Sequence, residues 1–248
     1  MNLFDLIKKS LGAMTLGLVV VVVQGCAIGP NVNPADPIEP LNRAVFNFND
    51  GVDRAILKPV AIAYDQVTPS PVKLGVSNFF GNISDVWSVV NNLLQFKIAE
   101  SLETLVRVGF NSTLGFGGLL DIGSELRLQK NTQDFGQTLG VWGFKAGPYV
   151  VLPLIGPSSV RDAVGTVVGA SADLVNNMNN VPFRNSVTAL RVVDGRAKAL
   201  DATKIIDEAA LDKYSFTRDL YLQRRAASIG KEAVVNEERF DLPAQSVK

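Results

Sequence analysis

Residues 147–162 read Gly147-Pro148-Tyr149-Val150-Val151-Leu152-Pro153-Leu154-Ile155-Gly156-Pro157-Ser158-Ser159-Val160-Arg161-Asp162. No charged side chain occurs between Ala146 and Val160, but the run is too short for a membrane-spanning helix, which needs about 20 apolar residues. Its three prolines and two glycines also disfavour one continuous helix. We therefore expect an apolar segment that is irregular or forms a hairpin.

The polar residues that close this stretch predict the start of a helix. Ser158 or Ser159 can accept hydrogen bonds from the first free backbone N–H groups, and Asp162 would lie in the first turn, where a negative charge suits the helix dipole. By itself, the stretch is most simply interpreted as a buried strand and a turn before a helix. That helix contains Gly165 and Gly169 in a GxxxG spacing, which permits close helix packing in lipid but also arises by chance.

The N-terminus has the pattern of a lipoprotein signal peptide. Two lysines at positions 8 and 9 precede an apolar run over residues 11–23, and Val23-Gln24-Gly25-Cys26 resembles a bacterial lipobox, with Gln24 as an unusual choice. Cys26 is the only cysteine, so it cannot form a disulfide within the chain, whereas lipidation explains its presence. A plain secreted protein or an N-terminal membrane anchor is the alternative.

The signal-peptide pattern and the composition of the remaining residues predict that the chain has four parts. They are a signal peptide over residues 1–25, a lipidated tether over 26–35, a helical domain over 36–229 and a polar, flexible tail over 230–248. Three acyl chains on Cys26 would exceed the two signals that stable anchoring needs.

Composition excludes several classes of function. The chain has 24 basic and 24 acidic residues, and such a balance argues against binding to nucleic acid, which needs a basic face. There is no histidine, so a Ser-His-Asp or Cys-His catalyst cannot be built from this chain. With one cysteine already assigned to lipidation, a zinc or transition-metal site is also disfavoured.

The periodicity predicts a mainly α fold. Helical segments are expected over residues 70–80, from 82 or 84 to about 98, over 97–114, 158–177 and 185–209, and around 221–225. No run in the mature chain has about 20 uninterrupted apolar residues, yet several helices are more apolar than a small soluble domain requires. Amphipathic helices lying in the plane of a membrane interface satisfy both observations.

Local signals predict further details. Asp36 before Pro37 resembles a helix N-cap, with Glu39 as its capping-box partner. Glu103 and Arg107 are four residues apart, the favourable order for an ion pair on a helix. Glycines at 143 and 147 would fold residues 138–142 and 149–154 together as a small hairpin.

Alternating asparagines and aromatic residues precede Asp50-Gly51 in residues 45–53. The segment fits a helix with a soft joint, or a turn in which asparagine side chains bond their own backbone. A surface helix with satisfied asparagines is the simplest interpretation.

Six blocks of the chain together indicate a family. They are residues 36–43 with 46–49, 75–79 with 81–82, 110–115 through 121, 134–140, 147–153 through 161–162, and 212–214 through 223–225. These blocks resemble the MlaA (VacJ) family of outer-membrane lipoproteins. The blocks follow one another in the order of the family and cover most of residues 36–225. The residue after Cys26 is alanine, not the aspartate of an inner-membrane retention signal, so the family rule implies the periplasmic leaflet of the outer membrane.

The resemblance implies a ring-like bundle of helices around an amphipathic passage for phospholipids. The family removes phospholipids misplaced in the outer leaflet, sits beside trimeric porins and passes lipid to a soluble periplasmic carrier; it implies no cofactor. Residues expected at the passage or its rim are Gly147, Pro148, Tyr149, Leu152, Pro153 and Gly156, with Arg161 and Asp162 as polar groups near its mouth. Residues expected to form a gating joint are Asn47, Phe48, Asn49 and Asp50.

Two other functions stay open at this point. A lipid hydrolase would need a base other than histidine, and the sequence has no GxSxG nucleophile elbow. A passive adaptor lipoprotein would bind a partner without moving lipid. The apolar run of residues 146–160 is therefore either a buried core strand or a wall that faces acyl chains.

Overall fold

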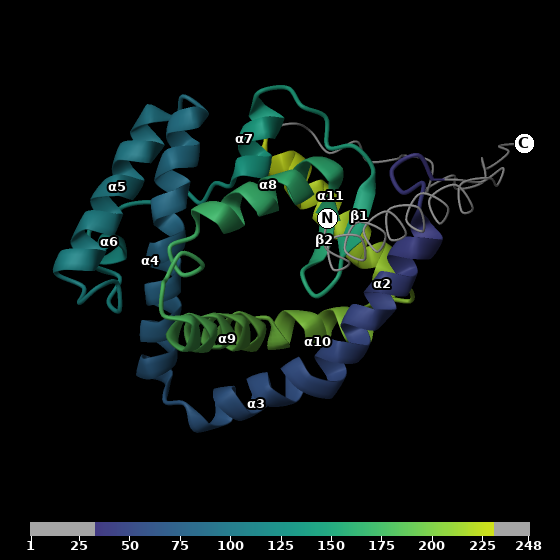
Figure 1. Cartoon of the computed structure of the whole chain (residues 1–248), viewed down its shortest axis with the longest axis horizontal. Helices are drawn as coiled ribbons and strands as arrows, with labels where there is room; N and C mark the ends of the chain where they lie inside the picture. The colour runs from purple at the N-terminus through teal and green to yellow at the C-terminus, as the bar shows by residue number, and fades with distance from the viewer. Residues whose placement is uncertain (1–32, 231–248) are drawn as a thin grey trace, which may run out of the picture.

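The computed structural model describes residues 33–230, which form a mostly helical ring with one small antiparallel hairpin (Figure 1). Helices α2 (Glu39–Val52), α4 (Ser70–Leu94), α8 (Val160–Ala172), α9 (Val181–Lys198) and α10 (Leu200–Ala209) and the hairpin are arranged around the ring, and α5 (Ile98–Thr113) and α6 (Ile122–Glu125) lie outside α4 (Figure 1). The expected mainly α class, ring-like arrangement and small hairpin are confirmed. None of the described helices is long and apolar enough to cross a membrane. The predicted signal peptide, the lipidation site Cys26 and the residues after 230 lie outside the described part.

The elements follow one another in the order α2 (Glu39–Val52), η1 (Asp53–Leu57), α3 (Lys58–Val67), α4 (Ser70–Leu94), α5 (Ile98–Thr113), α6 (Ile122–Glu125), α7 (Phe135–Val141), β1 (Tyr149–Leu152), β2 (Gly156–Ser159), α8 (Val160–Ala172), α9 (Val181–Lys198), α10 (Leu200–Ala209) and α11 (Lys213–Ser228).

The segment from α2 to α3 is one helical arm interrupted by a single π-helical turn. Pro59 has no backbone N–H, so the carbonyl of Ala55 lacks its α-helical donor. The helix widens to a π-helical turn just before this proline, and the N–H of Lys58 donates a hydrogen bond to the carbonyl of Asp53, five residues back. The interruption of this arm therefore lies at η1, which begins three residues after the segment 47–50 that the sequence singled out.

The helix pair α4 and α5 buries polar residues and exposes apolar ones. The buried side chains of α5 are Ser101, Thr104, Arg107 and Asn111. Those of α4 are Phe80, Asn82, Asp85, Ser88, Asn91 and Asn92. In the whole described part, six buried residues are apolar and nineteen are polar or charged, which reverses the usual distribution of a water-soluble domain.

Several local expectations were wrong. Helix α4 runs without a break through residues 82 and 84, where a second helix was expected to begin. The expected helix over 185–209 is two helices that meet at Ala199. Helix α2 starts at Glu39 with no side-chain cap, because Asp36 is buried and its carboxylate instead accepts hydrogen bonds from Asn42 within α2 and from Tyr214 and Arg218 of α11.

Two expected pairings also differ. Glu103 does not bond Arg107; it accepts from the backbone N–H of Gln129 and from Asn131, while Arg107 turns to Asp121. Strand β1 pairs with β2, from Tyr149 opposite Ser159 to Leu152 opposite Gly156. The expected partner, residues 138–142, belongs to α7 and the turn after it, because Asp134 and Gln137 form a capping box that starts a helix there.

Candidate functional site

The hairpin of β1 and β2 is buried at its base and exposed at its tip. Tyr149 and Val151 are 0% and 5% exposed, as the core-strand interpretation predicts, whereas Leu154 and Ile155 at the tip are 67% and 66% exposed. Leu154 has a φ of 62° and Gly156 one of 105°, left-handed values that close the tight turn. Figure 1 shows the tip projecting toward α10 on the inner side of the ring.

The residues expected at the passage or rim are thus divided. Tyr149 lies in the core, Leu152 and Gly156 are half-buried, and Gly147, Pro148 and Pro153 are exposed. The Tyr149 ring packs edge-on against Tyr214 of α11, at 6.2 Å between centroids. The base of the hairpin is therefore fixed, and only its turn presents apolar side chains outward.

Two asparagines of α2 fasten the free edge of β1. The Asn42 side chain donates to the carbonyl of Tyr149 at 2.9 Å and accepts from the N–H of Val151 at 2.9 Å. Asn49, two helical turns on, donates to the carbonyl of Leu152 at 3.0 Å and accepts from the N–H of Leu154 at 2.8 Å. Each amide thus satisfies the backbone groups that a neighbouring strand would satisfy.

The four residues of the expected gating joint all lie within α2. Asn49 holds the hairpin, Asp50 pairs with Arg54 one turn on, and Asn47 and Phe48 are exposed. The π-helical turn η1 follows them, and its first residue Asp53 accepts two hydrogen bonds from the Arg196 guanidinium, at 2.6 and 2.9 Å. Because Arg196 lies near the end of α9, this pair ties η1 to the helix that packs along α3.

A first buried cluster of charges lies between the start of the domain and α11. Asp36 is 1% exposed and accepts from Asn42 at 2.7 Å, from the Tyr214 hydroxyl and from Arg218 at 3.3 Å. Burial and the hydrogen bond to Asp36 raise the pKa of Tyr214. This cluster joins α2, α11 and, through Asn42, the hairpin.

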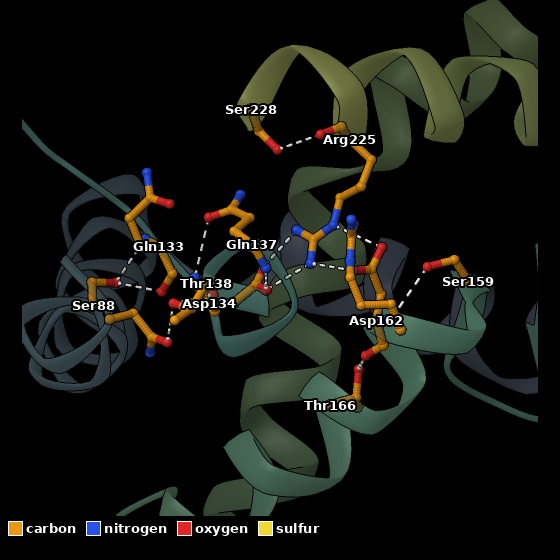
Figure 2. Close-up of polar contacts among 12 residues, drawn as sticks. Ser88, Gln133, Asp134, Gln137, Thr138, Ser159, Asp162, Thr166, Arg225 and Ser228 are labelled. Carbon is orange, nitrogen blue, oxygen red and sulfur yellow. Dashed lines mark hydrogen bonds and ion pairs between the residues drawn. The ribbon is translucent and has the colours of Figure 1, made fainter. Parts of the chain in front are cut away.

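A second cluster surrounds Asp162 at the start of α8 (Figure 2). Its carboxylate accepts from Arg161 at 2.8 Å, from Arg225 at 2.9 Å and from the Tyr221 hydroxyl at 2.6 Å. Arg225 also reaches Asp134 of the α7 cap at 2.6 Å. Burial opposes ionisation of Asp162, but the hydrogen bonds from Arg225 and Tyr221 outweigh it and lower its pKa.

The predicted helix start after the hairpin is confirmed, since Ser159 caps α8 by accepting from the N–H of Asp162 at 3.2 Å. Arg161 and Asp162, expected near a passage mouth, are instead 8% and 4% exposed. They hold α8 against α7 and α11, so any effect they have on a passage is indirect.

The GxxxG pair of α8 packs inside the chain. A Cβ placed on Gly165 would lie 2.7 Å from Gly136 Cα in α7, closer than real atoms approach. A Cβ on Gly169 would lie 3.4 Å from the indole nitrogen of Trp87 in α4. The spacing therefore serves contacts between helices of one chain.

Sequence reasoning missed the role of α11. Its residues Tyr214, Arg218, Tyr221 and Arg225 recur at spacings of four and three, so they share one face of a helix. That face contacts both charged clusters. The alternation of tyrosine and arginine could have identified it, but the partners Asp36, Asp134 and Asp162 are distant in sequence.

The charged side chains of the two clusters are occupied by one another. Within residues 33–230, no group of three or more histidine, cysteine, aspartate or glutamate side chains is placed to hold a metal ion. The buried arginines and carboxylates of the two clusters face one another, so the clusters are held by internal pairing. What the ring presents toward its middle from the hairpin is an uncharged apolar turn.

The described residues define the class of protein by its fold, which is an α-helical ring with an inserted β-hairpin and buried ion pairs. The family model for the MlaA lipoprotein matches residues 34–228. The chain is 33% identical over 223 residues to the intermembrane phospholipid transport system lipoprotein MlaA of Shigella flexneri, covering 88% of this chain and 87% of that relative. It is 33% identical over 195 residues to an uncharacterized protein of Rickettsia bellii, covering 78% and 76%.

A solved structure described as "Structural basis for maintenance of bacterial outer membrane lipid asymmetry" superposes with a TM-score of 0.69 at 31% identity, covering 78% of this chain and 98% of that one. The chain therefore belongs to the MlaA lipoprotein family.

Proposed function

We propose that this chain is an outer-membrane lipoprotein that removes mislocalised phospholipids from the outer leaflet through an amphipathic passage in its ring. The lipid would pass to a soluble periplasmic carrier, and a trimeric porin would stand beside the ring. Cys26 would carry the acyl chains that hold the protein in the periplasmic leaflet. The family membership and the names of its relatives support this role.

The single observation that carries the proposal is the hairpin tip. Leu154 and Ile155 in the turn between β1 and β2 are more than half exposed, the turn itself projects toward α10 (Figure 1), and no charge lies between Ala146 and Val160. A lipid that moves through a passage needs an apolar wall for its chains, and an uncharged turn supplies one. At the base of the hairpin, Arg161, Asp162 and Arg225 are paired with one another and largely buried, so these three groups add no exposed charge to that wall.

The arm of α2 and η1 would control the opening of this passage. Asn49 links the arm to the hairpin turn, and the Asp53–Arg196 pair links it to α9. A change in the bend at η1 would therefore move the hairpin tip relative to the opposite side of the ring.

The test exchanges the apolar tip for polar side chains in the double variant Leu154→Asn, Ile155→Ser. Asparagine tolerates the left-handed backbone at 154, so we expect normal folding. The matched control is Val67→Ser, an exposed apolar residue at the end of α3. Phospholipid transfer from vesicles containing the protein to a purified periplasmic carrier should fall at least several-fold for the double variant only. Unchanged transfer by the double variant would contradict the proposal that the hairpin turn forms a wall of the passage. If the wild-type protein transferred no phospholipid, the passive-adaptor function would be favoured instead.

A further inference from the structure

Two helical sides of the ring are each interrupted by a break in regular α-helical winding. At η1, the N–H of Lys58 bonds the carbonyl of Asp53, five residues back, so the helix is underwound. Between α9 and α10, the N–H of Ala199 bonds the carbonyl of Arg196, three residues back, so the chain is overwound. Helices bend where the regular ladder of backbone hydrogen bonds is broken. Each break is therefore a place where that side of the ring can change its bend.

Ion pairs connect the two breaks with each other. Asp53, the first residue of η1, accepts from Nε of Arg196 at 2.6 Å and from Nη2 at 2.9 Å. Lys58, directly after η1, lies 3.6 Å from the carboxylate of Asp207 on α10. The π-helical turn is thus tied to α9 before Ala199 and to α10 after it.

The Arg196 guanidinium contacts all three helical segments at the breaks. It projects from α9, binds Asp53 through two nitrogens, and donates from Nη1 to the hydroxyl of Thr203 on α10 at 3.2 Å. The Thr203 hydroxyl in turn donates to the carbonyl of Ala199 at 2.8 Å, inside the second break. A guanidinium presents its donors in a rigid planar fork. The positions of Asp53 and Thr203 are therefore fixed relative to each other.

Of the two ion pairs, the one with Arg196 is the stronger constraint. The side chains of Arg196 and Asp53 are 13% and 24% exposed, and their contact is bidentate. The side chains of Lys58 and Asp207 are each 38% exposed, and exposed pairs of this kind contribute little. Coupling between the breaks therefore depends mainly on Arg196.

This coupling reaches the hairpin. Asn49, on the same arm as Asp53, donates to the carbonyl of Leu152 and accepts from the N–H of Leu154 in the hairpin turn. The turn projects toward α10 (Figure 1). The arm that holds the hairpin and the helix that faces its tip are thus bound to one guanidinium.

We propose that Arg196 is a positioning residue that makes the two breaks bend together and so fixes the distance between the hairpin tip and α10. Without its contacts, each break bends independently, and the tip takes a range of positions relative to α10. The inference rests on the proposed function for its consequence, because this distance is the width of the proposed passage beside the hairpin.

The test measures that distance in the folded, full lipidated chain. Spin labels are attached at Ile155→Cys in the hairpin turn and at Lys204→Cys on α10, both exposed positions. Cys26 is acylated in this chain, so the two introduced thiols are the ones labelled. Double electron–electron resonance in nanodiscs of phosphatidylethanolamine and phosphatidylglycerol gives the distribution of distances between the labels.

We expect a narrow distribution in the parent and one that is about twofold broader or more in Arg196→Gln, because two independent bends both add to the spread. Arg196→Lys keeps the charge, but one ammonium cannot bridge Asp53 and Thr203, so it should also broaden the distribution. Asp53→Asn should have the same effect, and combining it with Arg196→Gln should add nothing further, because either change removes the same tie.

The matched control is Arg191→Gln, on the same helix. Arg191 is also partly buried, but it pairs with Asp173 in the turn after α8, at 2.8 Å. This change should leave the width of the distribution unchanged, even if it lowers the free energy of unfolding. Equal widths for the parent, Arg196→Lys and Arg196→Gln would overturn the inference, because an ion pair that only stabilises the fold would give that result. Equal broadening by Arg191→Gln would overturn it as well.

Phospholipid transfer to a purified periplasmic carrier, measured with the same variants, separates this inference from the proposed function. A broader distribution together with a several-fold change in the transfer rate would support both. A broader distribution with an unchanged transfer rate would support the coupling by Arg196 but contradict a passage between the hairpin tip and α10.

Discussion

The Arg225 guanidinium lies 2.9 Å from the Asp162 carboxylate, although 63 residues separate them in the sequence. This pair joins α11 to the first turn of α8, directly after the hairpin. Asp162 is 4% exposed, so its charge depends on partners within the chain. The position of the hairpin base therefore depends on the C-terminal helix.

Loss of the Arg225 side chain should destabilise the fold strongly. In Arg225→Met, the carboxylates of Asp162 and Asp134 lose their shared cation, and breaking a buried pair in this way costs about 3–5 kcal/mol. Because Arg225 is itself partly exposed, we expect the lower end of that range. Denaturant unfolding in detergent micelles measures the change. Arg224→Met, its exposed neighbour, should change the unfolding free energy by less than about 0.5 kcal/mol.

The free energy of unfolding should fall in acid because a defined set of carboxylates becomes protonated. The pKa values of Asp162, Asp121 and Asp212 lie below the ordinary value of about 3.9 in the folded chain. A lowered folded pKa gives stability that is present above the unfolded pKa and is lost as pH falls through the folded pKa. The unfolding free energy should therefore decline below about pH 4. Asp162→Asn should make this decline less steep and should lower stability at neutral pH. If the decline below about pH 4 were the same in this variant, Asp162 would not be one of the carboxylates that cause it.

Asp85 should change the free energy of unfolding with pH in the opposite direction. It is 1% exposed, and burial raises its pKa despite Lys130 at 3.6 Å. A raised pKa favours the protonated folded state, so this contribution is lost as pH rises through the folded pKa. We expect Asp85→Asn to raise the unfolding free energy at neutral pH and to have a smaller effect in acid. A loss of stability at neutral pH would show that the pair with Lys130 outweighs burial.

Gly165 should tolerate no side chain. Gly165→Ala places a methyl group against the backbone of Gly136, and such overpacking costs about 1–3 kcal/mol. Gly195→Ala is the matched control, because a Cβ there meets nothing within 4 Å on a helix of the same ring. That change should stabilise by about 0.5–1 kcal/mol. Thermal unfolding of both variants in micelles provides the comparison, and similar values for the two would contradict close packing of α7 on α8.

Asn49 should hold the hairpin turn, and Asn47 should not. Asn49→Ala removes two hydrogen bonds to β1 and its turn, a loss of about 1–3 kcal/mol. The N–H of Leu154 should then exchange with deuterium faster, because Asn49 is its acceptor. Asn47→Ala, two residues away on the exposed side of α2, should leave exchange at Leu154 unchanged. Exchange that is insensitive to both changes would exclude the link between α2 and the hairpin.

The sequence by itself determined the classes of element in this protein. The prolines and glycines of residues 147–157 excluded a long helix there, and Ser159 with Asp162 marked the start of α8, because turn and cap preferences act between near neighbours. Six family blocks in order also predicted the ring-like helical class. The lack of histidine restricted the chemistry before any fold was known.

Only the tertiary structure decided which side chains meet. Asp36 reads as an N-cap locally, but Asn42, Tyr214 and Arg218 draw it into the interior. Glycines 143 and 147 predicted residues 138–142 as a hairpin strand, yet the Asp134 capping box starts a helix there and leaves β1 to pair with β2. Burying charges requires partners at matching positions, and for Asp36, Asp134 and Asp162 the partners on α11 lie more than 50 residues away in the sequence. Local propensity does not indicate which residues far apart in the sequence will meet. The position of the hairpin is therefore decided by the packing of the helices around it.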